Sequence, residues 1–367
     1  MSIPIIPINP IKDTPNWRFD RYSRGQNYPT KITNTCEIPK NTVTIDTEGE
    51  CFICRCGEWL PASVGNINSM QNLDDIWNTP TAKILQQDIA DQKFTWCAVG
   101  HCGILDHNML GSKENRDNVW TPTHYVNLST DNSCNLACPS CRPSMVNFTT
   151  GPVFDTRYQQ TLHILELFKK FDKPLKLIMI GGGDPLASLI MRPLILDWDV
   201  KPTQYITLFT NGLLMKKLLP DSKILPGISE FWISIDAGSK EVYENVRRPG
   251  KFEILIENLE WLAKTKSKNV DVLLKFTLSD GNAADIINFA ELCNRYGFYG
   301  EIGALDNLDT YADDFNNHEV FFNIGHPLHQ TAIHQLQHVK DMPNIRISPS
   351  LIGFSTGFNK DTHDSTR

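Results

Sequence analysis

The sequence predicts an α/β fold: a parallel sheet or barrel of six strands, preceded by a small cysteine-rich α+β domain. Two observations support this fold class. From residue 123 onward, short apolar runs alternate with amphipathic helical patterns, as in repeated βα units. Nine of the ten cysteines fall within the first 141 of 367 residues. A chain of this length has room for a barrel and one appended domain.

The composition indicates a globular protein with a sizeable core, since 41% of the residues are hydrophobic and only 21% are charged. The net charge of −7, with no long block of lysine and arginine, argues against a nucleic-acid-binding surface. No apolar run approaches the roughly 20 residues that cross a bilayer, and residues 1–10 lack the basic start of a secretory signal. We therefore expect a cytoplasmic protein, in which cysteines serve as metal ligands or catalytic thiols.

The N-terminal segment divides into an arm and a cysteine-rich domain. Residues 1–30 are rich in proline and polar side chains, and we expect them to form an irregular arm. Residues 31–110 form the cysteine-rich domain, which opens with a β-hairpin. Thr42 to Asp46 alternates as a strand does, and Cys51 to Cys56 returns. Gly49 in the turn permits a positive φ.

The barrel is expected at residues 123–310, after a polar linker at residues 111–122. Its buried strands are predicted at Tyr125 to Leu128, Leu175 to Ile180, Tyr205 to Phe209, Phe231 to Ile235, Val270 to Leu278 and Tyr299 to Leu305. Helical patterns between them include Gln159 to Phe171, Glu253 to Lys264 and Ala283 to Tyr296. In α/β barrels the chemistry gathers at the carboxyl ends of the strands. Residues 311–356 are expected to form a helical extension, and residues 357–367 a disordered tail.

A three-cysteine loop follows the first barrel strand. Cys134, Cys138 and Cys141 have the spacing C-x3-C-x2-C. A short loop can wrap three thiolates around one face of an iron–sulfur cluster, which leaves the fourth iron without a protein ligand. A structural zinc site and plain core cysteines are the alternatives. Zinc sites favour paired C-x2-C units and a nearby fourth ligand, and no cysteine or histidine follows Cys141 within twenty residues.

This spacing resembles the signature of the radical S-adenosylmethionine (radical SAM) superfamily. In that family the open iron chelates the methionine moiety of the cofactor, and the reduced cluster cleaves it to a 5′-deoxyadenosyl radical. The resemblance implies a partial (β/α)6 barrel and a SAM-binding [4Fe–4S] cluster on the catalytic residues Cys134, Cys138 and Cys141. The family usually has an aromatic residue just before the third cysteine, near the adenine. Here that residue is Ser140, so another side chain must cover the base.

Further motifs at the predicted strand ends resemble cofactor-binding motifs of the same family. Gly181-Gly182-Gly183-Asp184-Pro185 is similar to its Gly-Gly-Glu motif, with aspartate for glutamate. A phosphate-binding loop is the weaker alternative, because a carboxylate and a proline serve an anion poorly. A guanidinium suits the cofactor carboxylate, but the sequence leaves open which of two arginines binds it. The implied cofactor contacts are Gly182, Gly183, Asp184, Thr210, Asn211, Ser234, Asp236, Arg247 and Arg248.

The cysteine-rich domain resembles the SPASM and twitch auxiliary-cluster domains of radical SAM enzymes. Cys36, Gly49 and Cys54 give the pattern C-x12-G-x4-C, and Leu73 to Asp91 reads as the helix that follows it. The resemblance implies a second, auxiliary [4Fe–4S] cluster with a closed ligand shell, suited to an electron-transfer or structural role. A zinc site is one alternative. Another is that Cys51 or Cys56 replaces an assigned ligand or serves a second site. The implied ligands are Cys36, Cys54, Cys97 and Cys102.

These resemblances predict a radical SAM enzyme that cleaves S-adenosylmethionine reductively and abstracts a hydrogen atom from a substrate. We expect a peptide substrate and an electron donor such as flavodoxin or ferredoxin. One alternative is dehydrogenation of a small-molecule alcohol by the same radical route. The other is a zinc-holding scaffold without catalytic activity.

Overall fold

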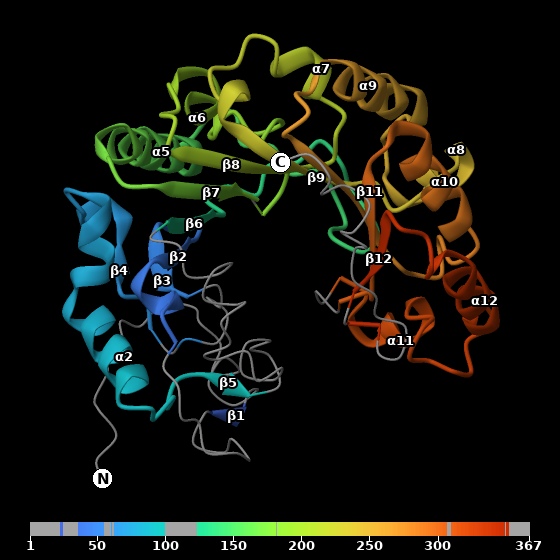
Figure 1. The fold of residues 1–367 in the computed structure, drawn as a ribbon, viewed down its shortest axis with the longest axis horizontal. Coiled ribbons are helices and arrows are strands. Elements are labelled where there is room, and N and C mark those ends of the chain that lie inside the picture. The colour runs from blue at the N-terminus through green and yellow to red at the C-terminus, as the bar shows by residue number, and fades with distance from the viewer. Residues whose placement is uncertain are drawn as a thin grey trace. The chain divides into compact units, whose positions relative to one another are not determined.

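The computed structural model describes residues 23–24, 36–54, 60, 62–99, 123–180, 182–306, 310–348 and 350–351 (Figure 1). The predicted linker, the C-terminal tail, Cys56 and Cys102 lie outside these residues. The chain forms two compact units. The first comprises residues 1–132, 148–182 and 190–206, and the second comprises residues 133–147, 183–189 and 207–367. The three-cysteine loop belongs to the second unit.

The first unit contains the predicted hairpin. Strands β2 (Thr42–Ile45) and β3 (Glu50–Ile53) pair antiparallel, with Val43 opposite Ile53. Gly49 in the turn has a φ of +80°, as predicted for this position. The hairpin continues the parallel strands, because β2 also pairs parallel with β6 (His124–Leu128), which pairs with β7 (Leu175–Met179). The alternation of apolar and polar residues in the sequence did not reveal the pairing of β2 with β6.

Smaller elements complete the first unit. They are β1 (Ser23–Arg24), β4 (Gly65–Asn66), β5 (Ala98–Val99), η2 (Ile38–Lys40), η3 (Ile67–Ser69), α5 (Pro152–Lys170) and α6 (Arg192–Asp197). β1 pairs antiparallel with β5, so the predicted irregular arm contributes one short strand.

The predicted single helix over residues 73–91 is wrong. The segment forms a 3-10 helix, η4 (Leu73–Asn78), and then the α-helix α2 (Pro80–Ala90). Thr79 separates them with an extended backbone, and its hydroxyl accepts the backbone N–H of Ala82 at 3.2 Å. Pro80 takes the first position of α2, where its missing N–H costs nothing.

The second unit contains four parallel strands: β9 (Ile228–Ser234), β10 (Asp271–Thr277), β11 (Tyr299–Gly303) and β12 (Ile345–Ile347). β8 (Gln204–Thr210) begins in the first unit and ends in the second. The six predicted barrel strands are thus present as β6 to β11, and the α/β fold class is confirmed. Residues 311–356, which were predicted to form a helical extension, contain the short strand β12 in addition to helices.

Helices pack on these strands and on one another. α10 (Ile286–Tyr296) packs on β11, and α12 (His329–Val339) packs on α10 (Figure 1). The ring of Phe289 in α10 lies 5.0 Å from that of Phe276 in β10. The remaining helices of the unit are α7 (Met215–Leu218), η5 (Leu225–Gly227), α8 (Lys240–Val246), α9 (Phe252–Thr265), η6 (Ala312–Asp314) and α11 (Phe315–His318). None of the helices described is both long and apolar enough to span a bilayer.

Candidate iron–sulfur and cofactor site

The three-cysteine loop is held in a defined conformation by backbone hydrogen bonds. Cys134 donates its N–H to the carbonyl of Val146 at 2.7 Å, and Cys141 donates to the carbonyl of Cys138 at 2.9 Å. Ala137 donates to the carbonyl of Arg248 at 2.7 Å, which ties the loop to the segment after α8. Cys134 is half-buried, Cys138 is buried and Cys141 is exposed. The loop therefore presents three thiols at different depths.

Arg142 interacts electrostatically with all three thiols of the loop. Burial disfavours the charge of Arg142, but a hydrogen bond to Cys141 and the charges of Cys134 and Cys138 raise its pKa. Burial raises the pKa of the Cys134 thiol to about 11, and it raises that of Cys138 too, where the Arg247 guanidinium opposes it. Within the described residues, no three His, Cys, Asp or Glu side chains could hold a single metal ion.

Asp184, in the segment that follows β7, connects the end of β8 to the start of the cysteine loop. Its buried carboxylate accepts the backbone N–H of Leu186 at 2.9 Å and that of Asn211 at 2.6 Å. It also accepts the hydroxyl of Thr210 at 2.8 Å, and its own N–H donates to Ser133 at 2.8 Å. Burial raises the pKa of Asp184, and these donors oppose the rise. Its carboxylate thus has internal partners, and a direct cofactor contact stays a prediction.

Asn211 reaches the cysteine loop directly. Its side-chain amide donates to Asn135 Oδ1 at 2.8 Å and lies 4.0 Å from Cys134 Sγ. Its own Oδ1 accepts the backbone N–H of Leu213 at 3.1 Å, which fixes the orientation of the amide. The structure therefore brings the predicted contact Asn211 beside a predicted cluster ligand.

Arg247 and Arg248 have different environments. Arg247 Nη2 lies 2.6 Å from Asp236 Oδ2, and Nη1 lies 3.6 Å from Cys138 Sγ. Asp236 has a φ of +53°, and its Oδ1 accepts the N–H of Thr277 at 2.7 Å. Arg248 is exposed, and its guanidinium bonds to the carbonyl and the side chain of Asn245. The charge of Arg247 is therefore already compensated inside the protein.

The remaining predicted contacts are less closely defined. Gly182, in the first unit, donates its N–H to Asp131 at 2.8 Å, and a Cβ there would lie 3.0 Å from Asn132 Cβ. Gly183 precedes Asp184 as a half-buried residue, and Ser234 ends β9. Their contacts with a cofactor stay predictions.

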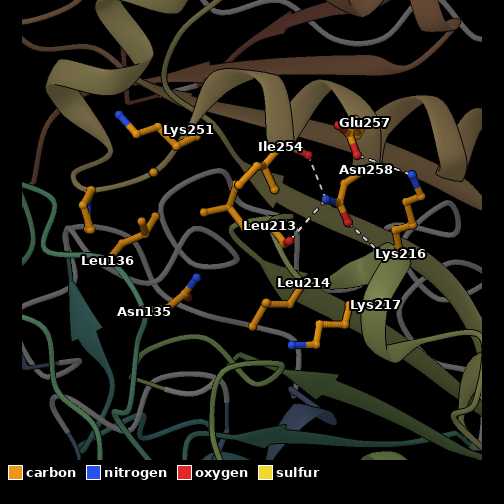
Figure 2. Close-up of a pocket in the computed structure, with 12 residues that line it drawn as sticks. Asn135, Leu136, Leu213, Leu214, Lys216, Lys217, Lys251, Ile254, Glu257 and Asn258 are labelled. Carbon is orange, nitrogen blue, oxygen red and sulfur yellow. Dashed lines mark hydrogen bonds and ion pairs between the residues drawn. The ribbon is translucent and has the colours of Figure 1, made fainter.

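A cavity of about 580 Å³ lies against the cysteine loop in the second unit (Figure 2). Asn258 braces its wall, since the side chain accepts the N–H of Lys216 and donates to the carbonyls of Leu213 and Ile254. We call this cavity the lysine cavity. Its lining residues are Asn135, Leu136, Leu213, Leu214, Lys216, Lys217, Pro249, Gly250, Lys251, Ile254, Glu257 and Asn258.

A smaller cavity of about 130 Å³ is lined in part by the loop residues Pro139 and Ser140. Tyr311 and His318 stack in its wall, with ring centroids 3.8 Å apart and planes inclined by 19°. We call it the tyrosine cavity. Its remaining lining residues are Asp236, Asn245, Val246, Arg248, Thr277, Ser279, Asp280, Gly281 and Asn282. Sequence spacing alone did not connect Tyr311 or His318 with Ser140.

These residues fit an iron–sulfur cluster with an adjacent ligand. Three thiols share one loop, and two buried polar atoms beside Cys138 have no hydrogen-bond partner among the described residues: Tyr243 Oη and Arg247 Nε. The charge of Cys138 also acts on the pKa of Tyr243, which burial raises. Such atoms are positioned to meet a group held by the thiols.

The predicted auxiliary ligands lie in the first unit. Cys36 precedes η2, Cys54 follows β3 with a φ of +78°, and Cys97 follows α2, all partly exposed. Cys51 differs, because its side chain is fully buried in the hairpin and burial raises its pKa strongly. Cys51 therefore packs as a core residue. Whether Cys102 completes the set stays a prediction.

Comparison with known families decides what this site belongs to. A family model of the radical SAM superfamily matches residues 128–293, and a model of the SPASM iron–sulfur cluster-binding domain matches residues 36–103. The chain thus contains a radical SAM domain, preceded by a SPASM-type segment. The matches confirm both predicted resemblances, with the SPASM-type segment before the radical SAM segment. They imply a SAM-binding [4Fe–4S] cluster and an auxiliary iron–sulfur site.

Several radical SAM relatives match part of the chain. It is 25% identical over 168 residues to the AdoMet-dependent heme synthase of Methanosarcina barkeri, covering 45% of each protein. It is 26% identical over 209 residues to a mycofactocin maturase of Mycobacterium tuberculosis, covering 56% of this chain and 48% of that protein. The solved structure of Streptococcus suis SuiB bound to precursor peptide SuiA gives 10% identity and a TM-score of 0.42, covering 86% and 73%. The match spans about half the length of the heme synthase and of the maturase.

Proposed function

We propose that this chain cleaves S-adenosylmethionine reductively and uses the product to abstract a hydrogen atom from a peptide. The observation that carries the proposal is the loop of Cys134, Cys138 and Cys141, with an amide beside the first thiol and a guanidinium beside the second. Cys134, Cys138 and Cys141 would hold an iron–sulfur cluster, which would supply the electron for reductive cleavage of S-adenosylmethionine. The protein's part is to hold and orient the cofactor and to exclude water.

Arg248 is the arginine that we assign to the cofactor carboxylate. Arg247 already compensates Asp236 in the interior, whereas Arg248 is exposed and lines the tyrosine cavity. A guanidinium can pair with a carboxylate through two parallel hydrogen bonds.

We assign the cover of the adenine to Tyr311 and its stacked partner His318. Ser140 cannot supply an aromatic ring, and it lines the same cavity as both of these side chains. Burial and the charge of Asp280 raise the pKa of Tyr311, so the phenol is neutral at physiological pH. A neutral aromatic ring suits stacking against a purine.

A peptide substrate is supported by the auxiliary SPASM domain and by the maturase among the relatives. Dehydrogenation of a small-molecule alcohol and a zinc scaffold have less support. Product analysis would separate peptide modification from alcohol dehydrogenation. Modification of a peptide would change the mass of that peptide, whereas alcohol dehydrogenation would yield an oxidised small molecule without any peptide.

The proposal is tested by anaerobic reconstitution with iron and sulfide. We expect about eight irons per chain, four for each cluster, and 5′-deoxyadenosine when dithionite and S-adenosylmethionine are added. The triple variant C134A/C138A/C141A should lose about half of the iron and all of the cleavage. C293A is the matched control, because Cys293 is buried in the core. Stoichiometric zinc without cofactor cleavage would contradict the proposal.

A further inference from the structure

The lysine cavity combines positive charge with apolar surface. Lys216, Lys217 and Lys251 line it, and Glu257 is its single acidic residue, so the lining carries a net charge of +2 within a chain of −7. Leu214 is half-exposed, and Ile254 is 46% exposed, an unusual surface position for such a side chain. This combination is typical of a surface that receives an acidic partner with some apolar contact.

The three lysines are available to a partner. Lys216 lies 3.4 Å from Glu257, and Lys251 lies 3.3 Å from Glu244, but both lysines are more than half exposed. Exposed ion pairs of this kind contribute little free energy and exchange readily with other partners. Across the described part of the chain, Lys217 makes no ion pair. Lys217 thus carries an uncompensated charge among the described residues, and the other two lysines are held only by exposed ion pairs.

The cavity leads to a cluster ligand through two side chains. Asn135 lines the cavity, and its Oδ1 accepts the amide of Asn211, which lies 4.0 Å from Cys134 Sγ. Leu136, the next lining residue, is buried under the same loop. A molecule seated in the lysine cavity thus contacts the wall that supports the cysteines. A cavity that only anchored a peptide far from the cluster, or only shaped the surface, would not require this chain of contacts to Cys134.

We propose that the lysine cavity is the docking surface for an acidic electron-transfer protein that reduces the cluster on Cys134, Cys138 and Cys141. This inference rests on the proposed function, which requires one electron per cleavage. The donor's reduced flavin or iron–sulfur centre loses one electron and the cluster gains it, with no bond made or broken. Acidic side chains of the donor pair with Lys217 and Lys251, while apolar contacts cover Ile254 and Leu214. Transient electron-transfer complexes use small interfaces.

The experiment compares two reductants on the reconstituted full chain. Formation of 5′-deoxyadenosine is measured with photoreduced flavodoxin and, separately, with dithionite. The variant K217E/K251E reverses two charges in the cavity. The variant K264E/K268E makes the same change of net charge on exposed lysines of the same unit, outside the cavity, and serves as the matched control.

We expect K217E/K251E to lower the flavodoxin-driven rate by about tenfold at low salt, because charge at an interface acts mainly on association. The wild-type rate should fall with added salt, while that of the variant should not. Dithionite-driven cleavage and iron content should stay at the wild-type level in both variants. Equal losses with both reductants, as a peptide-docking cavity would give, overturn the inference, and so does a variant that behaves like K264E/K268E. Failure of the proposed function itself would appear as no cleavage with dithionite in the wild type.

Discussion

At the scale of single residues, Arg247 carries a charge into the interior beside Cys138, a proposed cluster ligand. It pairs with Asp236 at 2.6 Å, and only 12% and 7% of the two side chains are exposed. We predict that R247M destabilises the protein by about 3–5 kcal/mol, because it leaves the carboxylate of Asp236 buried without its partner. Urea unfolding of the apo-protein measures this loss. The double variant R247M/D236N should recover most of it, and a double variant no more stable than R247M would refute the explanation.

Tyr311 provides a second test at this scale. We predict that Y311A weakens S-adenosylmethionine binding by about tenfold, since stacking of an aromatic ring on a base contributes about 1–3 kcal/mol. The change in the electron paramagnetic resonance spectrum of the reduced cluster on cofactor addition reports binding independently of turnover. S140F in the Y311A background should restore affinity, because it places a ring at the other wall of the cavity. H334A, on the exposed face of α12, is the control. Unchanged affinity in Y311A would remove Tyr311 from this role.

At the scale of elements, the β2–β3 hairpin contains a titrating carboxyl group. Asp46 Oδ1 accepts the N–H groups of Glu48 and Glu50, at 3.0 Å and 2.8 Å. Burial raises the pKa of Asp46 from 3.8 to about 6, and these bonds oppose the rise. The folded chain therefore holds this proton more tightly than the unfolded chain, so the stabilisation is complete below pH 3.8 and is lost as the pH rises through 6.

The variant D46N keeps Oδ1 as an acceptor and removes the titration. We predict that the melting temperature of the wild type falls relative to D46N as the pH is raised from 4 to 6.5. Thermal melting across that range, with D221N at an exposed site as the control, measures the difference. A constant difference between the wild type and D46N would show that Asp46 does not titrate there.

Sequence periodicity located the barrel strands within a few residues, because buried parallel strands are nearly continuous apolar runs. It missed β12, since three residues carry too little pattern and only pairing with β11 defines them. The break before Pro80 was visible in principle as a threonine cap followed by proline. The spacing of the three cysteines was sufficient to predict a cluster-binding loop after the first barrel strand. The contact of Asn211 with Cys134 could not be predicted in this way, because 77 residues separate the two and only the fold brings them together.

At the scale of the whole molecule, the two sets of cysteines predict separable iron contents. We predict that C36A/C54A lowers the iron content by about half, since each [4Fe–4S] cluster holds four irons, while cofactor cleavage with dithionite continues. C51A should leave the iron content unchanged, because Cys51 is buried in the hairpin core. Iron and sulfide assays on reconstituted variants measure both results. Loss of iron in C51A would place that thiol among the ligands instead.

The parallel pairing of β2 with β6 links the auxiliary segment to the strand that leads into the three-cysteine loop. Ser129, directly after β6, also donates its N–H to the carbonyl of Ile45 at 2.9 Å. A truncated chain that starts at residue 123 would leave one backbone edge of β6 bare. Bare edges recruit strands from other molecules and cause aggregation. The N-terminal segment thus covers one edge of β6 and also contributes thiols. Its excision would expose that edge, and we expect the remaining chain to aggregate.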